Sequence, residues 1–363
     1  MKKFILPVVL AFLGFVVHQS SAQTVSPSIT AMDGKLIFKI GDKVVTNYHH
    51  GKEVAKPYFW PMVTVTGNRV TRDWPMIQDS NEAKDHKHQK SAWFCHGDVI
   101  PEGLELKQRT KNVEGVDFWS EETNHGKIVC VKVGPVTSDK GIPTVSTLNE
   151  WRTTDGTVIM TEKRDISLEN AGNGYLIRIH SELIASNFPI TFGDTKEGSM
   201  GVRVRDSVTE KDNKGGKLTN AQGLQTEKAL WGKESAWCDY SGPCDKGTAG
   251  ITIFSDPKNA YSTAWHSRGY GLMAANPFGR NKSGFPDRKG NSDLVKIAKG
   301  NSLKLGFALY VHDGDEKEAK VNSAFKQAYA SNAPKTEILE SDSSSSTNRF
   351  RLFKKLKHRF RGQ

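Results

Sequence analysis

Apolar and polar residues alternate along much of the chain, and a period of two is typical of β-strands with one buried face. The clearest segments are 35–40, 174–183 and 302–311. Segment 127–133, KIVCVKV, is apolar at successive positions as well, so we expect a strand that is buried on both faces. These segments predict an all-β protein.

Turn and helix signals favour the same fold class. Asp155-Gly156 in TTDGTV predicts a hairpin turn with positive φ angles. The one convincing helical pattern is short and lies within 318–332, EAKVNSAFKQAYASN. We therefore predict a large antiparallel β-sandwich with few short helices.

The two ends of the chain differ from this body. MKK and the apolar run FILPVVLAFLGFVV predict a signal peptide over 1–22 with cleavage near Ala22, so the protein is expected to be exported, to the periplasm or beyond. That run is too short for a membrane-spanning helix, and an integral membrane protein is not expected. A single β-sandwich domain is expected over 23–333, then a serine-rich linker over 334–348 and a basic tail over 349–363.

The net charge of +11 is concentrated at the ends. Seven Lys and Arg residues lie in 349–363 and two in the signal peptide, which leaves the body near neutral and predicts no nucleic-acid surface. Phe350, Phe353, Leu356 and Phe360 can share one face of a helix, a pattern that suits contact with anionic lipid or polysaccharide. A solvated basic tail is the other interpretation.

Four cysteines leave the redox state open. Export permits disulfides, and Cys238 with Cys244 brackets a Gly-Pro pair that can turn the chain back. Cys95 with Cys130 is then the complementary pair. Free, partly buried thiols are the equally weighted alternative.

The densest group of reactive side chains is DHKHQKSAWFCHGDV, residues 85–99. In an extended segment His86 and His88 point to one face. The histidines suit proton transfer near neutral pH. They also suit a divalent metal, with His86, His88 and His96 as ligands and Asp85 or Asp98 completing the set. A surface loop whose histidines bind backbone groups is the third interpretation.

Several loops combine tryptophan with charged residues, a combination that suits a sugar ring and its hydroxyl groups. The candidate catalytic residues are His88, His96, Asp98 and Glu197. The candidate substrate-binding residues are Arg72, Asp85, His86, Trp93, Asp117, Trp119, Asp239, His266 and Arg268.

The chain also resembles a known family. The resemblance spans 51–315 and is carried by KPYFWPM, TRDWP, DHKHQKSAWFCHGDV, VDFWSEE, FGDTKEGSMGVRV, WCDYSG, GITIFSDPKN and WHSRGYGLMAANPFG. These motifs resemble the PmoA-like family of exported bacterial proteins, often labelled methane oxygenase PmoA. Lys56, Gln89 and Lys90 stand where that family commonly has Arg, His and Arg. A membrane monooxygenase subunit needs spanning helices, which this body lacks. The strand pattern is loosely similar to the galactose-mutarotase-like supersandwich.

Three functions follow as hypotheses. The leading one is an exported carbohydrate-active protein, of epimerase, lyase or hydrolase type, that uses acid–base chemistry on a sugar or oligosaccharide without a cofactor. The second is a metal-dependent hydrolase or oxygenase that uses His86, His88 and His96. The third is a non-catalytic sugar-binding envelope protein. A carbohydrate is the expected ligand in the first and third.

Overall fold

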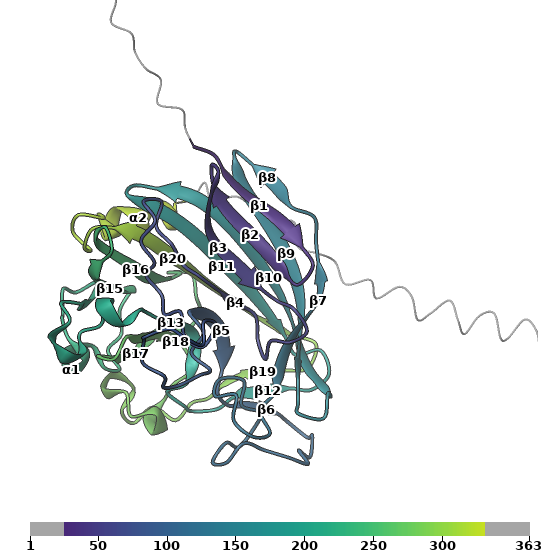
Figure 1. Ribbon diagram of the computed structural model, residues 1–363. Helices are drawn as coiled ribbons and strands as arrows, with labels where there is room; N and C mark the ends of the chain where they lie inside the picture. The colour runs from purple at the N-terminus through teal and green to yellow at the C-terminus, as the bar shows by residue number, and fades with distance from the viewer. Residues whose placement is uncertain (1–24, 331–363) are drawn as a thin grey trace, which may run out of the picture.

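The computed structural model describes residues 25–330, which form antiparallel sheets stacked in layers (Figure 1). The eight-stranded sheet has the order β1 Pro27–Met32, β2 Lys35–Ile40, β3 Lys43–His49, β4 Tyr58–Phe59, β5 Ala92–His96, β13 Gly198–Arg203, β18 Leu272–Asn276 and β17 Ala264–Arg268. The prediction of a large antiparallel β-sandwich is confirmed.

A nine-stranded sheet forms the second layer. Its order is β14 Lys217–Asn220, β15 Trp237–Cys244, β16 Gly247–Ser255, β20 Ser302–Asp313, β11 Gly174–Ile184, β10 Val158–Ala171, β9 Ile142–Arg152 and β7 Lys127–Val133, with β8 Thr137–Asp139 paired to β9. A small third sheet has the order β19 Val295–Ile297, β12 Ile190–Phe192 and β6 Val99–Pro101.

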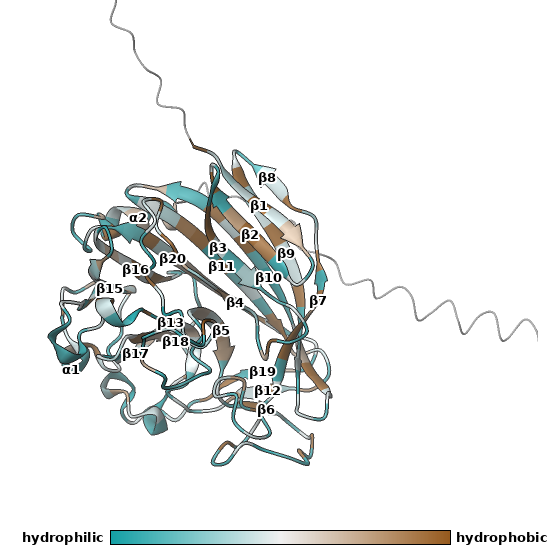
Figure 2. Ribbon diagram, viewed as in Figure 1, coloured by the Kyte–Doolittle hydropathy of each residue, from teal (hydrophilic) through white to brown (hydrophobic). Residues whose placement is uncertain are grey.

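The main hydrophobic core lies between the two large sheets. Phe94 of β5 packs its ring against Trp151 of β9 and Phe307 of β20, which joins the layers. Apolar residues gather on the strands and polar residues on most connecting loops (Figure 2). The burial of these large apolar side chains is the main force that holds the sheets together.

The alternating segments form the strands that they predict. Lys35–Ile40 is β2 and buries Leu36, Phe38 and Ile40. Segments 174–183 and 302–311 lie in β11 and β20. The predicted hairpin turn joins β9 to β10, although of its two central residues only Gly156 has a positive φ, of 90°.

The prediction for 127–133 is half wrong. The segment is a strand, β7, but it is not buried on both faces, because Val131 is 43% exposed. β7 is the last strand on its side of the nine-stranded sheet, where residues 130–133 border an open pocket instead of packing inside the core. A period analysis does not distinguish such an end strand from a central one.

Helices are few and short, as predicted. They are α1 Glu227–Leu230 and α2 Val321–Ala328, with four 3-10 helices over 206–208, 211–213, 281–283 and 286–288 in the described residues. α2 buries Val321, Ala324 and Ala328 in a second apolar cluster that includes Trp237 and Tyr310 of the nine-stranded sheet. Between residues 25 and 330, no helix has the length and apolar character needed to cross a bilayer.

The disulfide alternative is not met, since all four cysteines are free. WCDYSGPC does not turn back at its Gly-Pro pair but continues as strand β15. Its six-residue span of extended chain separates the Cα atoms of Cys238 and Cys244 by roughly 20 Å, far beyond the reach of one bridge. The predicted signal peptide, the linker and the basic tail lie outside the described residues.

Candidate functional site

One face of the eight-stranded sheet carries most of the candidate residues. The register aligns Trp93 of β5 with Gly201 of β13, Gly201 with Ala274 of β18, and Ala274 with His266 of β17. Neighbouring residues in a strand point to opposite faces, and Phe94 points into the core. Trp93 and its row therefore lie on the opposite face of the sheet from Phe94, which we call the site face, and Trp93 and Trp119 are themselves buried there in the apolar cluster.

Gly201 makes room for two indole rings on the site face. A β-carbon at this position would lie 2.7 Å from Trp93 Cζ2 and 3.1 Å from Trp119 Cη2. The two rings meet edge to face, with centroids 5.0 Å apart. Both rings are buried, and within residues 25–330 neither indole nitrogen has a hydrogen-bond partner. Because Gly201 has no side chain, the two indole rings can pack against it and form the floor of the site.

His266 and Glu197 lie beside this floor. The imidazole of His266 is parallel to Trp119 within 20°, and its Nδ1 donates to the Lys196 carbonyl oxygen at 3.0 Å. Glu197 Oε2 is 3.7 Å from the same nitrogen, and Glu197 Oε1 pairs with Lys196 Nζ at 2.8 Å. Burial lowers the pKa of His266 to about 3, so the ring is neutral near pH 7. Glu197 is 29% exposed and reaches solvent.

Partly exposed aromatic rings surround this pair. Trp231 contacts His266 edge to face at 5.2 Å, and the guanidinium of Arg268 lies 3.8 Å from the Trp231 ring centroid. Arg268 also pairs with Glu227 of α1 at 3.0 Å. Tyr270 stacks on His86 at 5.1 Å and lies under the guanidinium of Arg203 at 4.5 Å. Planar rings and cations thus occur together at the surface of the site face.

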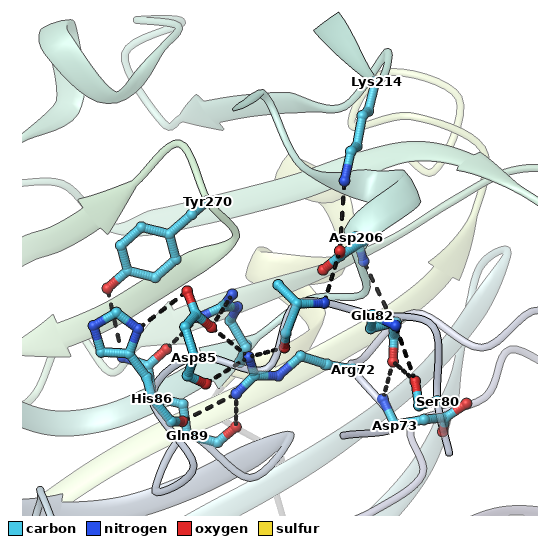
Figure 3. Close-up of polar contacts among 12 residues, drawn as sticks. Arg72, Asp73, Ser80, Glu82, Asp85, His86, Gln89, Asp206, Lys214 and Tyr270 are labelled. Carbon is cyan, nitrogen blue, oxygen red and sulfur yellow. Dashed lines mark hydrogen bonds and ion pairs between the residues drawn. The ribbon is translucent and has the colours of Figure 1, made fainter. Parts of the chain in front are cut away.

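A buried arginine shapes the loop that carries His86 and His88 (Figure 3). Arg72 pairs with Asp85 at 2.6 Å and donates to the carbonyl oxygens of Ala83, Asp85, His86 and Gln89. Arg203 binds the same Asp85 oxygen at 2.8 Å. The backbone polar groups of this irregular segment are satisfied in this way. Arg72 therefore holds the loop in place through Asp85 and the backbone carbonyl groups, while the Asp85 side chain remains 41% exposed.

Two lysines and one glutamate complete the site next to that loop. Glu121 binds the buried Lys56 at 2.8 Å through one oxygen and Lys90 at 2.7 Å through the other. Although burial raises the pKa of Glu121, the stronger effect of Lys56 and Lys90 holds it at about 2. Burial and Lys56 lower the pKa of the half-buried His88 to about 3. His88 is therefore a neutral imidazole near pH 7.

Comparison with known protein families assigns the chain. The model of DUF6807, described as a family of unknown function, matches residues 35–326, which is more than half of the chain. The chain belongs to DUF6807. No curated protein matches this DUF6807 chain. The resemblance to PmoA-like proteins is tested by none of these comparisons and stays a prediction.

Solved structures that resemble this DUF6807 protein include a galactose mutarotase-like protein from Clostridium acetobutylicum, with 10% identity, 79% of this chain and 95% of that chain covered, and a TM-score of 0.33. Galactose 1-epimerase from Lactobacillus acidophilus matches with 6% identity, 80% and 100% coverage, and a TM-score of 0.35. A 4-alpha-glucanotransferase from Thermococcus litoralis matches with 11% identity, 81% and 38% coverage, and a TM-score of 0.27. These matches agree with the loose similarity expected from the strand pattern, but such scores carry no argument about activity.

His96 of this DUF6807 protein does not join His86 and His88. It points to the opposite side of β5 from Trp93, and its ring packs between Phe192 and Phe278. Its Nε2 donates to the Gly193 carbonyl oxygen at 2.9 Å, and burial lowers its pKa to about 4. The expectation that His96 shares a site with His88 is wrong, because strand alternation separates the two.

Asp98 and Asp117 accept hydrogen bonds from backbone N–H groups rather than face a ligand on the site face. Asp98 accepts from Gly115 N–H at 2.7 Å, while burial raises its pKa to about 6. Asp117 accepts from the N–H groups of Trp119 and Ser120 and so fixes the turn that presents Trp119. The tryptophan is in the site, and the aspartate holds it there.

Asp239 belongs to another part of the molecule. It lies in β15 of the nine-stranded sheet, where it is fully buried against His312 at 2.9 Å and Thr252 at 2.7 Å. Its placement in a substrate site is therefore wrong. The motif WCDYSG gave no sign of this, because an aspartate beside an aromatic residue reads the same in a loop and in a buried strand.

The three histidines considered as metal ligands do not come together. His86 and His88 are neighbours, with ring centroids 5.8 Å apart, but His96 lies on the other side of the sheet. In the described part of the chain, no three His, Cys, Asp or Glu side chains are arranged to hold a metal ion.

Sequence reasoning also missed functional candidates. It did not single out Lys56, Lys90 or Trp231 as site residues, and Glu121, Arg203 and Tyr270 occur in it only inside the motifs VDFWSEE, FGDTKEGSMGVRV and WHSRGYGLMAANPFG. A signal for Lys90 existed in its place within the histidine-rich stretch. None existed for Trp231, which reaches the site from the segment after α1.

Proposed function

We propose that this DUF6807 protein acts on a sugar or oligosaccharide by acid–base chemistry on the site face. One observation carries the proposal. Two proton-exchanging groups that reach solvent, Glu197 and His88, occur on the same face as the partly exposed rings of Trp231 and Tyr270. Aromatic rings cover the apolar faces of a sugar, and convergent polar groups orient its hydroxyls.

The roles follow from protonation and exposure. The neutral imidazole of His88 is in the form that accepts a proton from a substrate hydroxyl or carbon. Glu197 is the second group, and it exchanges a proton on the opposite side of the reaction so that the pair returns to its starting state. Lys196, paired with Glu197 at 2.8 Å, and the nearby His266 position that carboxyl group.

The exported location is part of the same proposal, and it depends on residues 1–22. The reaction type stays at the level of epimerase, lyase or hydrolase, because all three need an acid and a base at a sugar ring.

Turnover of a sugar panel tests the proposal. The full chain is incubated with neutral and acidic mono- and oligosaccharides. NMR follows anomer or epimer exchange, reducing-end assays follow hydrolysis, and ultraviolet absorbance follows unsaturated lyase products. For the active sugar we expect Glu197→Gln and His88→Gln each to lower kcat by about 10²–10⁴-fold.

Glu122→Gln is the matched control, because Glu122 is an exposed glutamate in the loop that carries Trp119 and Glu121. It should keep full activity. Binding of a sugar without turnover in any assay would replace the enzyme by the non-catalytic sugar-binding protein. Full activity in both site variants would remove their assigned roles.

A further inference from the structure

We infer that the natural ligand is an acidic sugar, whose carboxylate binds at the end of the site face formed by Lys90, His86 and His88. This inference rests on the proposed function and narrows its substrate class to uronate-containing saccharides. It rests on the distribution of ion pairs around the site.

The first observation is the group formed by Lys56, Lys90 and Glu121. The carboxylate of Glu121 pairs with two ammonium groups, at 2.8 Å and 2.7 Å. The three side chains together therefore carry one net positive charge. Lys56 is buried and also donates to the Trp119 carbonyl oxygen at 3.0 Å. Lys90 is 22% exposed, so the excess charge reaches solvent through Lys90.

The adjacent loop is balanced in charge. One Asp85 oxygen pairs with both Arg72 and Arg203. Glu82 lies within electrostatic range of Arg72. Its oxygens accept from the backbone N–H groups of Asp73 and Asp206, which are neutral and leave its negative charge in place (Figure 3). The two buried guanidinium groups are therefore offset by two carboxylates, and the excess positive charge of this end is that of Lys90.

The other end of the site face is balanced. Lys196 pairs with Glu197, and Arg268 pairs with Glu227, one cation to each carboxylate. The positive excess is therefore confined to the end that holds Lys90 and the two histidines. A ligand that carries its negative group on one side would bind in a single orientation, with that group at Lys90 and its ring toward Glu197.

A carboxylate suits this end for a geometric reason. Neutral His88, which lies within electrostatic range of Glu121, supplies a ring N–H group at this end, whereas His86 Nδ1 is already paired with Asp85 at 3.2 Å. A carboxylate accepts hydrogen bonds through both oxygens, and such bonds are strongest where the donor is charged. The hydroxyl of a neutral sugar gains no comparable charge-assisted bond.

The test compares matched sugars that differ only at the acidic group. Affinities of the full chain for glucuronate and glucose, and for galacturonate and galactose, are measured by NMR titration at constant ionic strength, with the corresponding disaccharides alongside. We expect the uronate of at least one pair to bind about tenfold more tightly than its neutral partner. Lys90→Gln should abolish that preference while the neutral sugar binds as before, and Lys90→Arg should keep it.

Lys87→Gln is the matched control, since Lys87 is an exposed lysine in the same loop, and it should preserve the preference. Thermal unfolding of each variant verifies folding. Equal affinity for acidic and neutral sugars would overturn the inference and leave the proposed function intact. Tighter binding of a sulfate ester than of the uronate would overturn the choice of a carboxylate. Binding of no sugar in the panel by the folded protein would remove the proposed function and the inference together.

Discussion

Two of the histidine–carboxylate pairs in this protein, one beside each large sheet, differ in their access to solvent. On the site face, His266 Nδ1 is 3.7 Å from Glu197, whose side chain is 29% exposed. In the nine-stranded sheet, His312 Nε2 is 2.9 Å from Asp239, and both side chains are fully buried. The pair with the better hydrogen-bond geometry is the one that no ligand can reach.

The remaining contacts explain this difference. Both ring nitrogens of His312 face protein oxygens, those of Asp239 and Gly314, and Asp239 also accepts from Thr252. Apart from Asp239 Oδ2, these polar groups have partners inside the fold. Glu197 instead keeps an open side beside partly exposed aromatic rings. A close histidine–carboxylate pair therefore indicates a structural role here, and a loose and accessible pair indicates a candidate site.

The largest expected effect is on the buried pair. Asp239→Ala leaves His312 and Thr252 without their acceptor in a site that excludes water, so we expect the free energy of unfolding to fall by about 3–5 kcal/mol. Urea denaturation followed by intrinsic tryptophan fluorescence measures this loss. Sugar affinity of the remaining folded protein should be unchanged, because Asp239 does not lie on the site face.

Asp79→Asn is the control for that substitution, because Asp79 is exposed, and its stability change should stay within about 0.5 kcal/mol. A loss of sugar binding in folded Asp239→Ala protein would contradict the separation of the two regions.

The second effect concerns acid sensitivity at the open site. Lys56 and Lys90 depress the folded-state pKa of Glu121 to about 2, below its ordinary value of 4.5, so the ion pairs stabilise the fold above pH 4.5. That contribution is lost as the pH falls from 4.5 through about 2, and it amounts to about 3 kcal/mol at neutral pH. Between about pH 7 and pH 3.5 the wild type should lose about 1 kcal/mol through this group.

Glu121→Gln should remove this part of the pH dependence, whereas Glu122→Gln should keep it, in urea denaturation series at each pH. If Glu121→Gln and the wild type lose stability in parallel over this range, the two lysines do not hold Glu121 ionised.

The strands were predictable because each depends on the alternation of apolar and polar residues within its own segment. Alternation in 35–40, 174–183 and 302–311 gives the correct strands, since the face that each strand buries is set by its own residues. The position of a strand within its sheet depends on partners that are remote in sequence. For this reason 127–133 is correct as a strand and wrong as a strand buried on both faces.

The site was predictable only in part for the same reason. His86, His88, Trp93 and Trp119 fall within or near one dense stretch, and the structure places all four on or beside the site face. His96 is in that stretch too, but alternation within β5 turns it to the other side. Asp239 was misplaced because its β-strand and its partner His312 are fixed by long-range pairing.

The last comparison uses two glycines, one in each region. Gly201→Ala would bring a methyl group within 2.7 Å of Trp93 and 3.1 Å of Trp119, and these ring edges can shift. Gly250→Ala would meet the Tyr240 carbonyl oxygen at 2.7 Å, as well as His312 and Ser241, and backbone cannot move aside as easily. We expect Gly201→Ala to cost about 1–3 kcal/mol of unfolding free energy and Gly250→Ala to cost more. Only Gly201→Ala should also weaken sugar binding, because it displaces the indole floor of the site. Weaker sugar binding in folded Gly250→Ala protein, with normal sugar binding in Gly201→Ala protein, would contradict the assignment of sugar binding to the site face and of a structural role to the region around His312.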